Sequence, residues 1–123
     1  MELHESAEDY LEAILMIREE KGYVRSVEVA EHLGVSKPSV SVAMKKLRDN
    51  GYLEPEDGAG LVLTEEGMAV ASRIYERHRV LSRYLMMLGV DAETARADAC
   101  KMEHDLSEQS YHAIKARVLA EDK

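Results

Sequence analysis

The sequence predicts a mainly α fold, with a winged helix-turn-helix over residues 1–63 followed by an all-helical part over residues 64–123. Three observations lead to this prediction. Apolar residues recur at helical spacing along most of the chain. A glycine, Gly34, separates two short amphipathic stretches, as in a helix-turn-helix. Two short apolar runs then flank a glycine-rich turn, which is typical of a two-stranded wing.

The first two predicted helices are short and amphipathic. One runs from residue 6 to about residue 20, with Ser6 placed to cap its start and Gly22 placed to end it. The second runs over residues 26–33, after which Gly34 provides the permissive backbone of a turn. The second helix and this turn form the first part of a helix-turn-helix.

The third predicted helix follows that turn and leads into the wing. Ser36 is placed to cap it, and Pro38 lies in its first turn, where a missing N–H is tolerated. Gly51 ends the helix. The wing strands are expected over residues 52–54 and 61–64, on either side of the turn-forming sequence Asp-Gly-Ala-Gly.

The remainder of the chain is expected to be helical. Thr64 caps a long helix over residues 65 to about 88, which Gly89 ends. Two further helices are expected, over residues 92 to 102 or beyond and over residues 107–119. No internal repeat or low-complexity segment interrupts this pattern.

The composition narrows the class of protein. The chain has 123 residues, a formal net charge of −8 and one cysteine, Cys100, which cannot form an intrachain disulfide. No apolar run is long enough to cross a bilayer, and the N-terminal residues lack the basic start and apolar stretch of a signal peptide. We therefore expect a soluble, cytoplasmic protein without a membrane partner. The negative charge argues against a non-specific nucleic-acid binder.

Positive charge is concentrated in the helix-turn-helix, residues 26–49. Between Lys37 and Arg48 lie four basic residues and no acidic one, so this stretch carries +4 and the remainder of the chain −12. This distribution predicts binding to double-stranded DNA, with the start of the second helix at base edges and nearby hydroxyls and bases at phosphates. The predicted DNA-binding residues are Ser36, Lys37, Pro38, Ser39, Ser41, Val42, Lys45 and Lys46.

An ordinary three-helix bundle with a solvated lysine face is the structural alternative, because amphipathic helices joined by glycine turns occur in many proteins that do not bind DNA. The wing weakens the DNA-binding interpretation slightly. Glu54, Glu56 and Asp57 are acidic, whereas a wing that contacts phosphate usually carries Arg or Lys. We therefore expect poor contact between the wing and DNA.

Six side chains that could bind metal occur on the predicted helices. They are Asp9, Glu12, His78, Cys100, Glu103 and His104. The first two are three residues apart, and the last three are spaced i, i+3 and i+4, so each set projects from one face of its helix. Together they would form a mixed O/N/S site for a divalent transition metal such as Fe, Mn, Co or Zn.

Five of the six also have an ordinary structural explanation. Asp9 could stabilise the helix N-terminus, Glu12 could be a surface acid, and Cys100 could pack in the core. Glu103 and His104 could lie on a solvated face. Spacing alone leaves both interpretations open, because nothing local brings helices so distant in sequence together.

Several separated motifs occur in a characteristic order: SAEDYLEAI, VAEHLGVSKPSVSVAMKKLRDNGYL, GLVLTEEGMAVA, RHRVL and ADACKMEHDLS. In this order they resemble the diphtheria toxin repressor family of iron- and manganese-dependent transcriptional regulators along nearly the whole chain. The resemblance implies that all six residues bind an activating metal, Mn²⁺ or Fe²⁺, with Co²⁺ or Zn²⁺ as alternatives in vitro. It also implies a DNA-binding domain over residues 1–63 and a metal-binding and dimerisation domain over residues 64–123.

The departures from the family pattern concern the choice of metal. At the position of Asp9 the iron-responsive branch has methionine and the manganese-responsive branch aspartate, whereas at Cys100 they have cysteine and glutamate. Asp9 favours Mn²⁺ or Fe²⁺, and a Cys100 thiolate favours softer, later metals. Ser82 and Arg96 replace a carboxylate and a histidine of an ancillary site, which we therefore do not expect in its usual form. A second metal that shares the carboxylates remains an alternative.

The resemblance implies a homodimeric repressor of metal-homeostasis genes, in a short form without the SH3-like domain of longer relatives. Ligands from both halves would let metal favour the arrangement that binds DNA. Dimerisation would place two recognition helices on a two-fold symmetric operator. The residues expected to form the dimer are Val70, Ile74, Leu81, Leu85 and Leu88.

Two other functions are open to the same sequence. A helical di-metal enzyme characteristically carries two Glu-x-x-His pairs. Here Tyr75 stands three residues before His78, and Glu103 is adjacent to His104, so we expect no enzyme. The other alternative is a winged-helix regulator that responds to an organic ligand or to no ligand, with the six residues merely structural.

Overall fold

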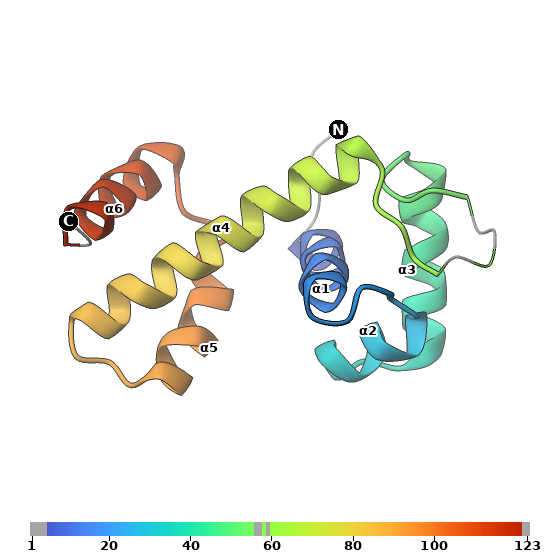
Figure 1. The fold of residues 1–123 in the computed structure, drawn as a ribbon, viewed down its shortest axis with the longest axis horizontal. Helices are drawn as coiled ribbons and strands as arrows, with labels where there is room; N and C mark the ends of the chain where they lie inside the picture. Colours follow the sequence, from blue (N-terminus) through green and yellow to red (C-terminus); the bar gives the residue numbers. More distant parts are fainter. Residues whose placement is uncertain (1–4, 56–57, 59, 122–123) are drawn as a thin grey trace. The chain divides into compact units, whose positions relative to one another are not determined.

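The computed structural model describes residues 5–55, 58 and 60–121, which contain six helices and confirm the mainly α prediction. The chain divides into two compact units, Met1–Ser72 and Arg73–Lys123, and the long helix α4 (Glu65–Met87) has residues in both (Figure 1). The domain boundary expected after residue 63 stays a prediction. No helix in the described ranges is long and apolar enough to cross a membrane.

The first unit contains three helices that pack on one another: α1 (Glu5–Lys21), α2 (Ser26–Leu33) and α3 (Lys37–Asp49) (Figure 1). Each contributes fully buried apolar side chains to a common core, and burial of this area drives their association. These side chains include Leu11, Ile14, Val29, Val40 and Met44. Ser6, which the sequence suggested as a cap, lies inside α1 instead.

The turn between α2 and α3 follows the sequence prediction closely. Gly34 has a φ of 68°, the left-handed conformation that glycine adopts without steric strain. Ser36 is the N-cap of α3, and its Oγ accepts a hydrogen bond from the backbone N–H of Ser39 at 3.2 Å. Pro38 lies in the first turn, as expected. The helix-turn-helix is therefore fixed by local backbone chemistry as well as by its core.

The wing is smaller than the sequence suggested. Among the described residues it has a single antiparallel bridge, between Leu53 and Leu63, in place of two strands. The backbone N–H of Glu54 donates to Val62 at 2.9 Å beside this bridge. Glu56, Asp57 and Ala59 of the expected wing lie outside the described residues.

The second unit consists of most of α4 together with α5 (Ala92–Met102) and α6 (Glu108–Glu121). Ile74, Leu81, Ala95 and Ala99 are fully buried in its core. Two of these, Ile74 and Leu81, were expected at a dimer surface, and the structure corrects that expectation because their side chains are covered within the chain. The exposed large apolar residues of this unit are Met86, Met87, Leu88 and Leu119.

The start of α4 approaches the base of the wing very closely. Thr64 caps the helix by accepting a hydrogen bond from the N–H of Gly67 at 3.1 Å, and its hydroxyl donates to the carbonyl of Gly51 at 2.6 Å. A Cβ atom added at Gly67 would lie 2.0 Å from the carbonyl oxygen of Tyr52. Only glycine allows this contact, because the obstructing atom belongs to the backbone.

We predict that Gly67→Ala destabilises the first unit, although alanine ordinarily stabilises a helix interior relative to glycine by about 1 kcal/mol. The steric clash should reverse that sign and reduce the free energy of unfolding by about 1–3 kcal/mol, the usual range for overpacking. Urea denaturation measures the change. Ser72→Ala, at an exposed position of the same helix, is the control and should be neutral or slightly stabilising. Equal unfolding midpoints for Gly67→Ala and the unmodified chain would contradict the predicted clash.

Candidate metal centre and DNA-binding surface

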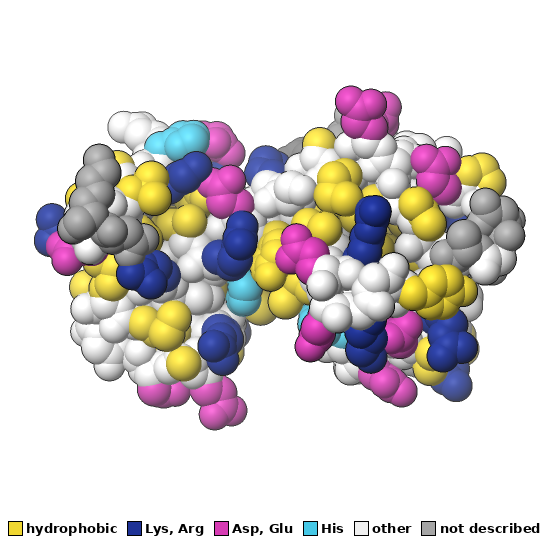
Figure 2. All heavy atoms as spheres, viewed as in Figure 1, with side chains coloured by type: hydrophobic (Ala, Val, Ile, Leu, Met, Phe, Trp, Pro, Cys, Tyr) yellow, Lys and Arg dark blue, Asp and Glu magenta, His cyan; other side chains and the backbone are white. Residues whose placement is uncertain are grey.

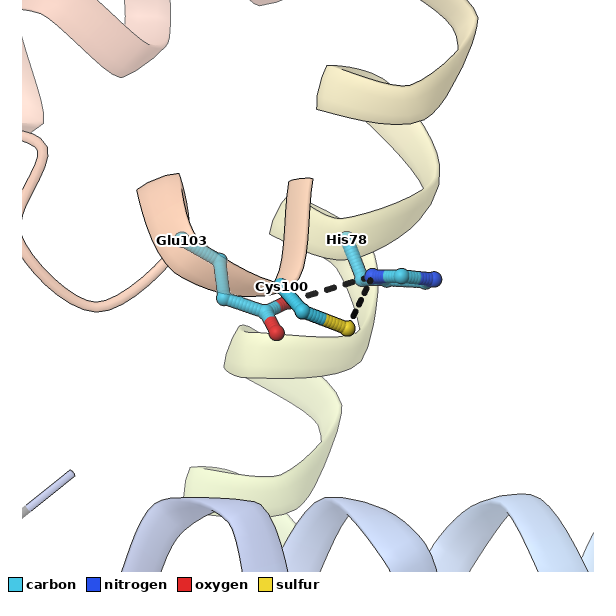
Figure 3. Close-up of side chains that lie close together, drawn as sticks. All are labelled: His78, Cys100 and Glu103. Atoms are coloured by element: carbon cyan, nitrogen blue, oxygen red, sulfur yellow. Dashed lines mark hydrogen bonds and ion pairs between the residues drawn. The ribbon is translucent and has the colours of Figure 1, made fainter. Parts of the chain in front are cut away.

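Three of the predicted ligands converge in the second unit. His78 lies on α4, Cys100 lies on α5, and Glu103 is the residue directly after α5 (Figure 3). Their ligand atoms all lie within 4.8 Å of one another. The Nδ1 atom of His78 is 3.7 Å from Cys100 Sγ and 3.5 Å from Glu103 Oε2. Residues from two helices thus present nitrogen, sulfur and oxygen donors to a common point.

Glu103 is the most unusual member of this cluster. Its side chain is 0% exposed, and neither carboxylate oxygen has a hydrogen-bond partner among the described residues. A buried carboxylate without such partners is energetically unfavourable unless a cation lies beside it. The nearest basic groups are two imidazoles, His78 and His104, the latter with its Nε2 atom 3.7 Å from Glu103 Oε1.

The surroundings of His78 favour a positive charge. The Cys100 side chain, followed by the buried Glu103 carboxylate, raises the pKa of His78 to about 10. Both groups stabilise the imidazolium form, and burial opposes them only in part. The same donors that stabilise a proton on this imidazole would stabilise a metal cation in its place.

Cys100 does not pack in the core, because its side chain is exposed. This excludes the structural explanation considered for it and leaves a thiol that faces both solvent and His78. Ser82 is buried and Arg96 is exposed. Neither offers a carboxylate or an imidazole, and the absence of the usual ancillary site stays a prediction.

The two remaining predicted ligands lie in the first unit. Asp9 and Glu12 are on α1, where Asp9 is half-buried and Glu12 is buried. Burial of Glu12 argues against an ordinary surface acid, since carboxylates are seldom buried without a compensating partner. Of the six predicted ligands, four are therefore gathered in the second unit and two are on one helix of the first.

The donor set fits a divalent transition metal. A thiol, a buried carboxylate and imidazoles are ligands of Mn, Fe, Co and Zn sites, whereas Mg²⁺ and Ca²⁺ favour sites built of oxygen alone. The buried carboxylate of Glu103, without hydrogen bonds from the described residues, is where a bound cation would compensate charge in place of the proton on His78. The cluster therefore offers donors of the kinds that such a metal prefers, within 4.8 Å of one another.

The predicted DNA-binding residues lie on one accessible surface. All eight are exposed. Val40, Met44 and Leu47, which recur at helical spacing in α3, are buried against the core. Val42, an apolar residue, is 57% exposed. The outer face of α3 is therefore available, with hydroxyls and Val42 near its start and lysines further along.

Arg25 was not among the DNA-binding residues predicted from the sequence, yet it shares a pocket with Arg48 of α3. Arg25 precedes α2 and lines a shallow pocket of about 230 Å³ together with Ser26, Arg48 and the wing residues Gly58 and Gly60. Elsewhere, charged side chains of both signs are interspersed on the face drawn in Figure 2. The count of basic residues from Lys37 to Arg48 did not include Arg25, which lies before that stretch. Its position at the start of α2, where the helix N-terminus favours anions, was the available signal.

Two family profiles match the chain. Residues 2–61 match the iron dependent repressor N-terminal DNA binding domain, and residues 64–119 match the iron dependent repressor metal binding and dimerisation domain. The transcriptional regulator MntR of Escherichia coli O6:H1 is 40% identical over 111 residues, which cover 90% of this chain and 72% of that protein. The HTH-type transcriptional regulator MntR of Bacillus subtilis is 42% identical over 109 residues, covering 89% and 77%.

Solved structures show the same architecture. The structure of the manganese regulator SloR matches with a TM-score of 0.81 and 30% identity, over 91% of this chain and 53% of SloR. The chain thus spans about half the length of that protein.

These relatives are transcriptional regulators, so the enzyme interpretation is set aside. The two profiles together cover nearly all of the sequence, and the chain belongs to the iron dependent repressor family of DNA-binding, metal-dependent regulators.

Proposed function

We propose that this protein is a cytoplasmic repressor of metal-homeostasis genes, with Mn²⁺ or Fe²⁺ as the activating metal. The observation that carries the proposal is the cluster of His78, Cys100 and Glu103, in a chain whose α3 exposes a row of DNA-binding side chains. Manganese is the metal named for several relatives, including SloR and a manganese-dependent repressor solved with manganese. Asp9 supports the same choice because it adds a hard oxygen ligand.

The proposed ligands are the six predicted from the sequence: Asp9, Glu12, His78, Cys100, Glu103 and His104. Support comes from the convergence of the second-unit residues and from the burial of Glu12 and Glu103. A bound divalent ion would supply positive charge that compensates the carboxylates. The thiol of Cys100 distinguishes this donor set from an all-carboxylate one and should increase affinity for Co²⁺ and Zn²⁺ in vitro.

Coupling between metal and DNA follows from where these ligands lie. Asp9 and Glu12 belong to the unit that carries the helix-turn-helix, and the other four belong to the second unit. If metal binds more tightly to the DNA-competent arrangement, DNA must increase metal affinity by the same factor, because linkage is reciprocal. Such couplings typically amount to about 1–3 kcal/mol, or about 5–150-fold in affinity.

DNA recognition is assigned to the exposed face of α3. Ser39 and Ser41 carry hydroxyls that can contact phosphate or base edges, and Val42 can contact a thymine methyl group. Ser36 is already engaged as the cap of α3, so its role at DNA is the more restricted. Lys37, Pro38, Lys45 and Lys46 complete the set, and we add Arg25 as a phosphate contact.

The active form is proposed to be a homodimer on a two-fold symmetric operator. The family profile over residues 64–119 is that of a dimerisation domain. Met86, Met87, Leu88 and Leu119 provide exposed apolar area in the second unit, which a symmetric partner would cover. Two helix-turn-helix motifs related by the dimer axis would then contact half-sites one or more helical turns apart.

The decisive experiment is selection from a random double-stranded DNA library with and without Mn²⁺. We expect one palindromic sequence to be enriched only with the metal. The selected duplex is then titrated anaerobically with the protein in Mn²⁺, Fe²⁺, Co²⁺ and Zn²⁺. Equal enrichment and equal affinity with chelator present would reject metal dependence and favour the regulator that responds to an organic ligand or to none.

Glu103→Gln should abolish the metal stimulation of DNA binding while the fold is retained. The amide preserves the shape of the side chain but removes its charge, so metal affinity is lost together with the coupling of about 5–150-fold. Electrophoretic mobility shift with and without Mn²⁺ measures this stimulation, and circular dichroism checks the fold. Asp105→Asn, the same type of change at an exposed position two residues away, is the control and should respond to Mn²⁺ normally. An undiminished response of Glu103→Gln would exclude Glu103 as a ligand.

Lys46→Ala should weaken DNA binding for all sequences alike and lower the salt dependence of the binding constant, as the slope of log K against log [salt], by about 1. The reason is that one fewer phosphate is neutralised and one fewer counterion released. Fluorescence anisotropy at several salt concentrations measures the slope. Arg117→Ala removes the same charge from an exposed site in the second unit and should leave the slope unchanged. An unchanged slope for Lys46→Ala would remove Lys46 from the phosphate contacts.

A further inference from the structure

Arg77 is a buried arginine adjacent to a predicted ligand, and its contacts converge on the segment that follows α5. Its side chain is only 3% exposed. The Nη1 atom donates to the carbonyl of Glu103 at 3.1 Å and to the carbonyl of Leu106 at 2.7 Å. The Nη2 atom forms an ion pair with Glu108, at the start of α6. One guanidinium therefore joins α4, the turn after α5 and α6.

The turn that Arg77 holds carries two of the proposed ligands. Helix α5 ends at Met102, and Glu103 is its C-cap residue, whose N–H still donates to the carbonyl of Ala99 at 3.0 Å. Carbonyl groups at a helix C-terminus lack intrahelical partners and carry partial negative charge. Arg77 Nη1 donates to one such carbonyl, that of the C-cap residue Glu103, in a buried setting where an unpaired carbonyl would be unfavourable, and to the part-buried carbonyl of Leu106 in the turn beyond it.

Arg77 and His78 hold Glu103 from two sides. His78 lies 3.5 Å from the carboxylate of Glu103, and the preceding residue, Arg77, binds the main-chain carbonyl of the same residue. Adjacent residues of α4 thus contact the side chain and the backbone of one proposed ligand. The guanidinium is planar and rigid, so these donors also fix the orientation of the turn.

We propose that Arg77 is a positioning residue for the metal centre, which sets the backbone of residues 103–106 so that Glu103 and His104 are held ready for the metal. This inference rests on the proposed metal site. Arg77 would not touch the metal, and its effect would be transmitted through two main-chain hydrogen bonds. Residues that orient ligands in this way typically contribute about 10–100-fold to metal affinity.

A purely structural role is the competing explanation, because the same guanidinium anchors α6. Besides the ion pair with Glu108, it lies 4.8 Å from the centre of the Tyr111 ring. An anchor for α6 would contribute to the stability of the second unit but not to metal affinity. The two roles are therefore separated by measuring Mn²⁺ affinity and thermal unfolding on the same variants.

The test uses Arg77→Lys, which retains the charge but cannot donate to both carbonyls and Glu108 in the same geometry. Arg79→Lys is the matched control: the same exchange two residues away, at an exposed arginine stacked 4.7 Å from the Tyr75 ring. The dissociation constant for Mn²⁺ is measured by electron paramagnetic resonance of free Mn²⁺. We expect Arg77→Lys to weaken binding about 10–100-fold and Arg79→Lys to bind like the unmodified chain.

Glu108→Gln separates anchoring from positioning, because it removes the ion pair with α6 while both carbonyl bonds remain. It should lower the unfolding temperature but change Mn²⁺ affinity far less than Arg77→Lys does. Equal weakening by the two variants would show that the effect passes through α6 and would overturn the proposal. If Arg77→Lys does not fold, Arg77→Gln replaces it, since its shorter side chain buries no charge and its one amide group cannot reproduce the guanidinium contacts with both carbonyls and Glu108.

The remaining outcomes are equally distinct. Failure of the unmodified chain to bind Mn²⁺ would reject the proposed metal site itself. Normal Mn²⁺ binding by the unmodified chain and by a folded Arg77 variant would reject only the positioning role. Weaker Mn²⁺ binding by the Arg77 variant, with Arg79→Lys and Glu108→Gln little changed, would support it.

Discussion

The buried carboxylate of Glu103 is the constraint on which the organisation of the second unit depends. A charged group at 0% exposure is tolerated only where other charges and dipoles compensate it. Two imidazoles approach its oxygens, and the guanidinium of Arg77 binds its carbonyl. Through Arg77, the turn that carries this residue is linked to α4 and to Glu108 at the start of α6.

The helical framework could be predicted from the sequence because its determinants are local. Ser36, Thr64 and the glycines after the helices act within a few residues of their own positions, and the structure confirms them. The wing was overestimated, since two short apolar runs predict strands but do not reveal how few ladder hydrogen bonds form. The buried side chains of Ile74 and Leu81 were assigned to a dimer surface, because periodicity identifies an apolar stripe but not what covers it.

The side chains of the candidate metal site could be predicted from the sequence, but the arginine contacts around them could not. His78, Cys100 and Glu103 have side chains typical of metal ligands, and their types and spacing along the chain are enough to identify them as candidates. Arg77 escaped notice because it binds main-chain carbonyls, and a carbonyl has no signature in the sequence. Arg25 was missed for a related reason: the chain brings it to Arg48 only after folding. Long-range contacts of arginine are the part of this protein that sequence patterns represent least well.

The exposed Val42 on α3 bears on the difference between the affinity of a repressor for DNA and its specificity for one sequence. Contacts from lysine to phosphate weaken as salt is added, because the released counterions re-enter a more concentrated solution. The proposed contact between Val42 and a thymine methyl group would involve no ion release. Its discrimination between thymine and other bases should therefore persist as the salt concentration rises. A repressor with this surface would keep its choice of sequence in cells whose ionic strength fluctuates, even while the fraction of occupied sites falls.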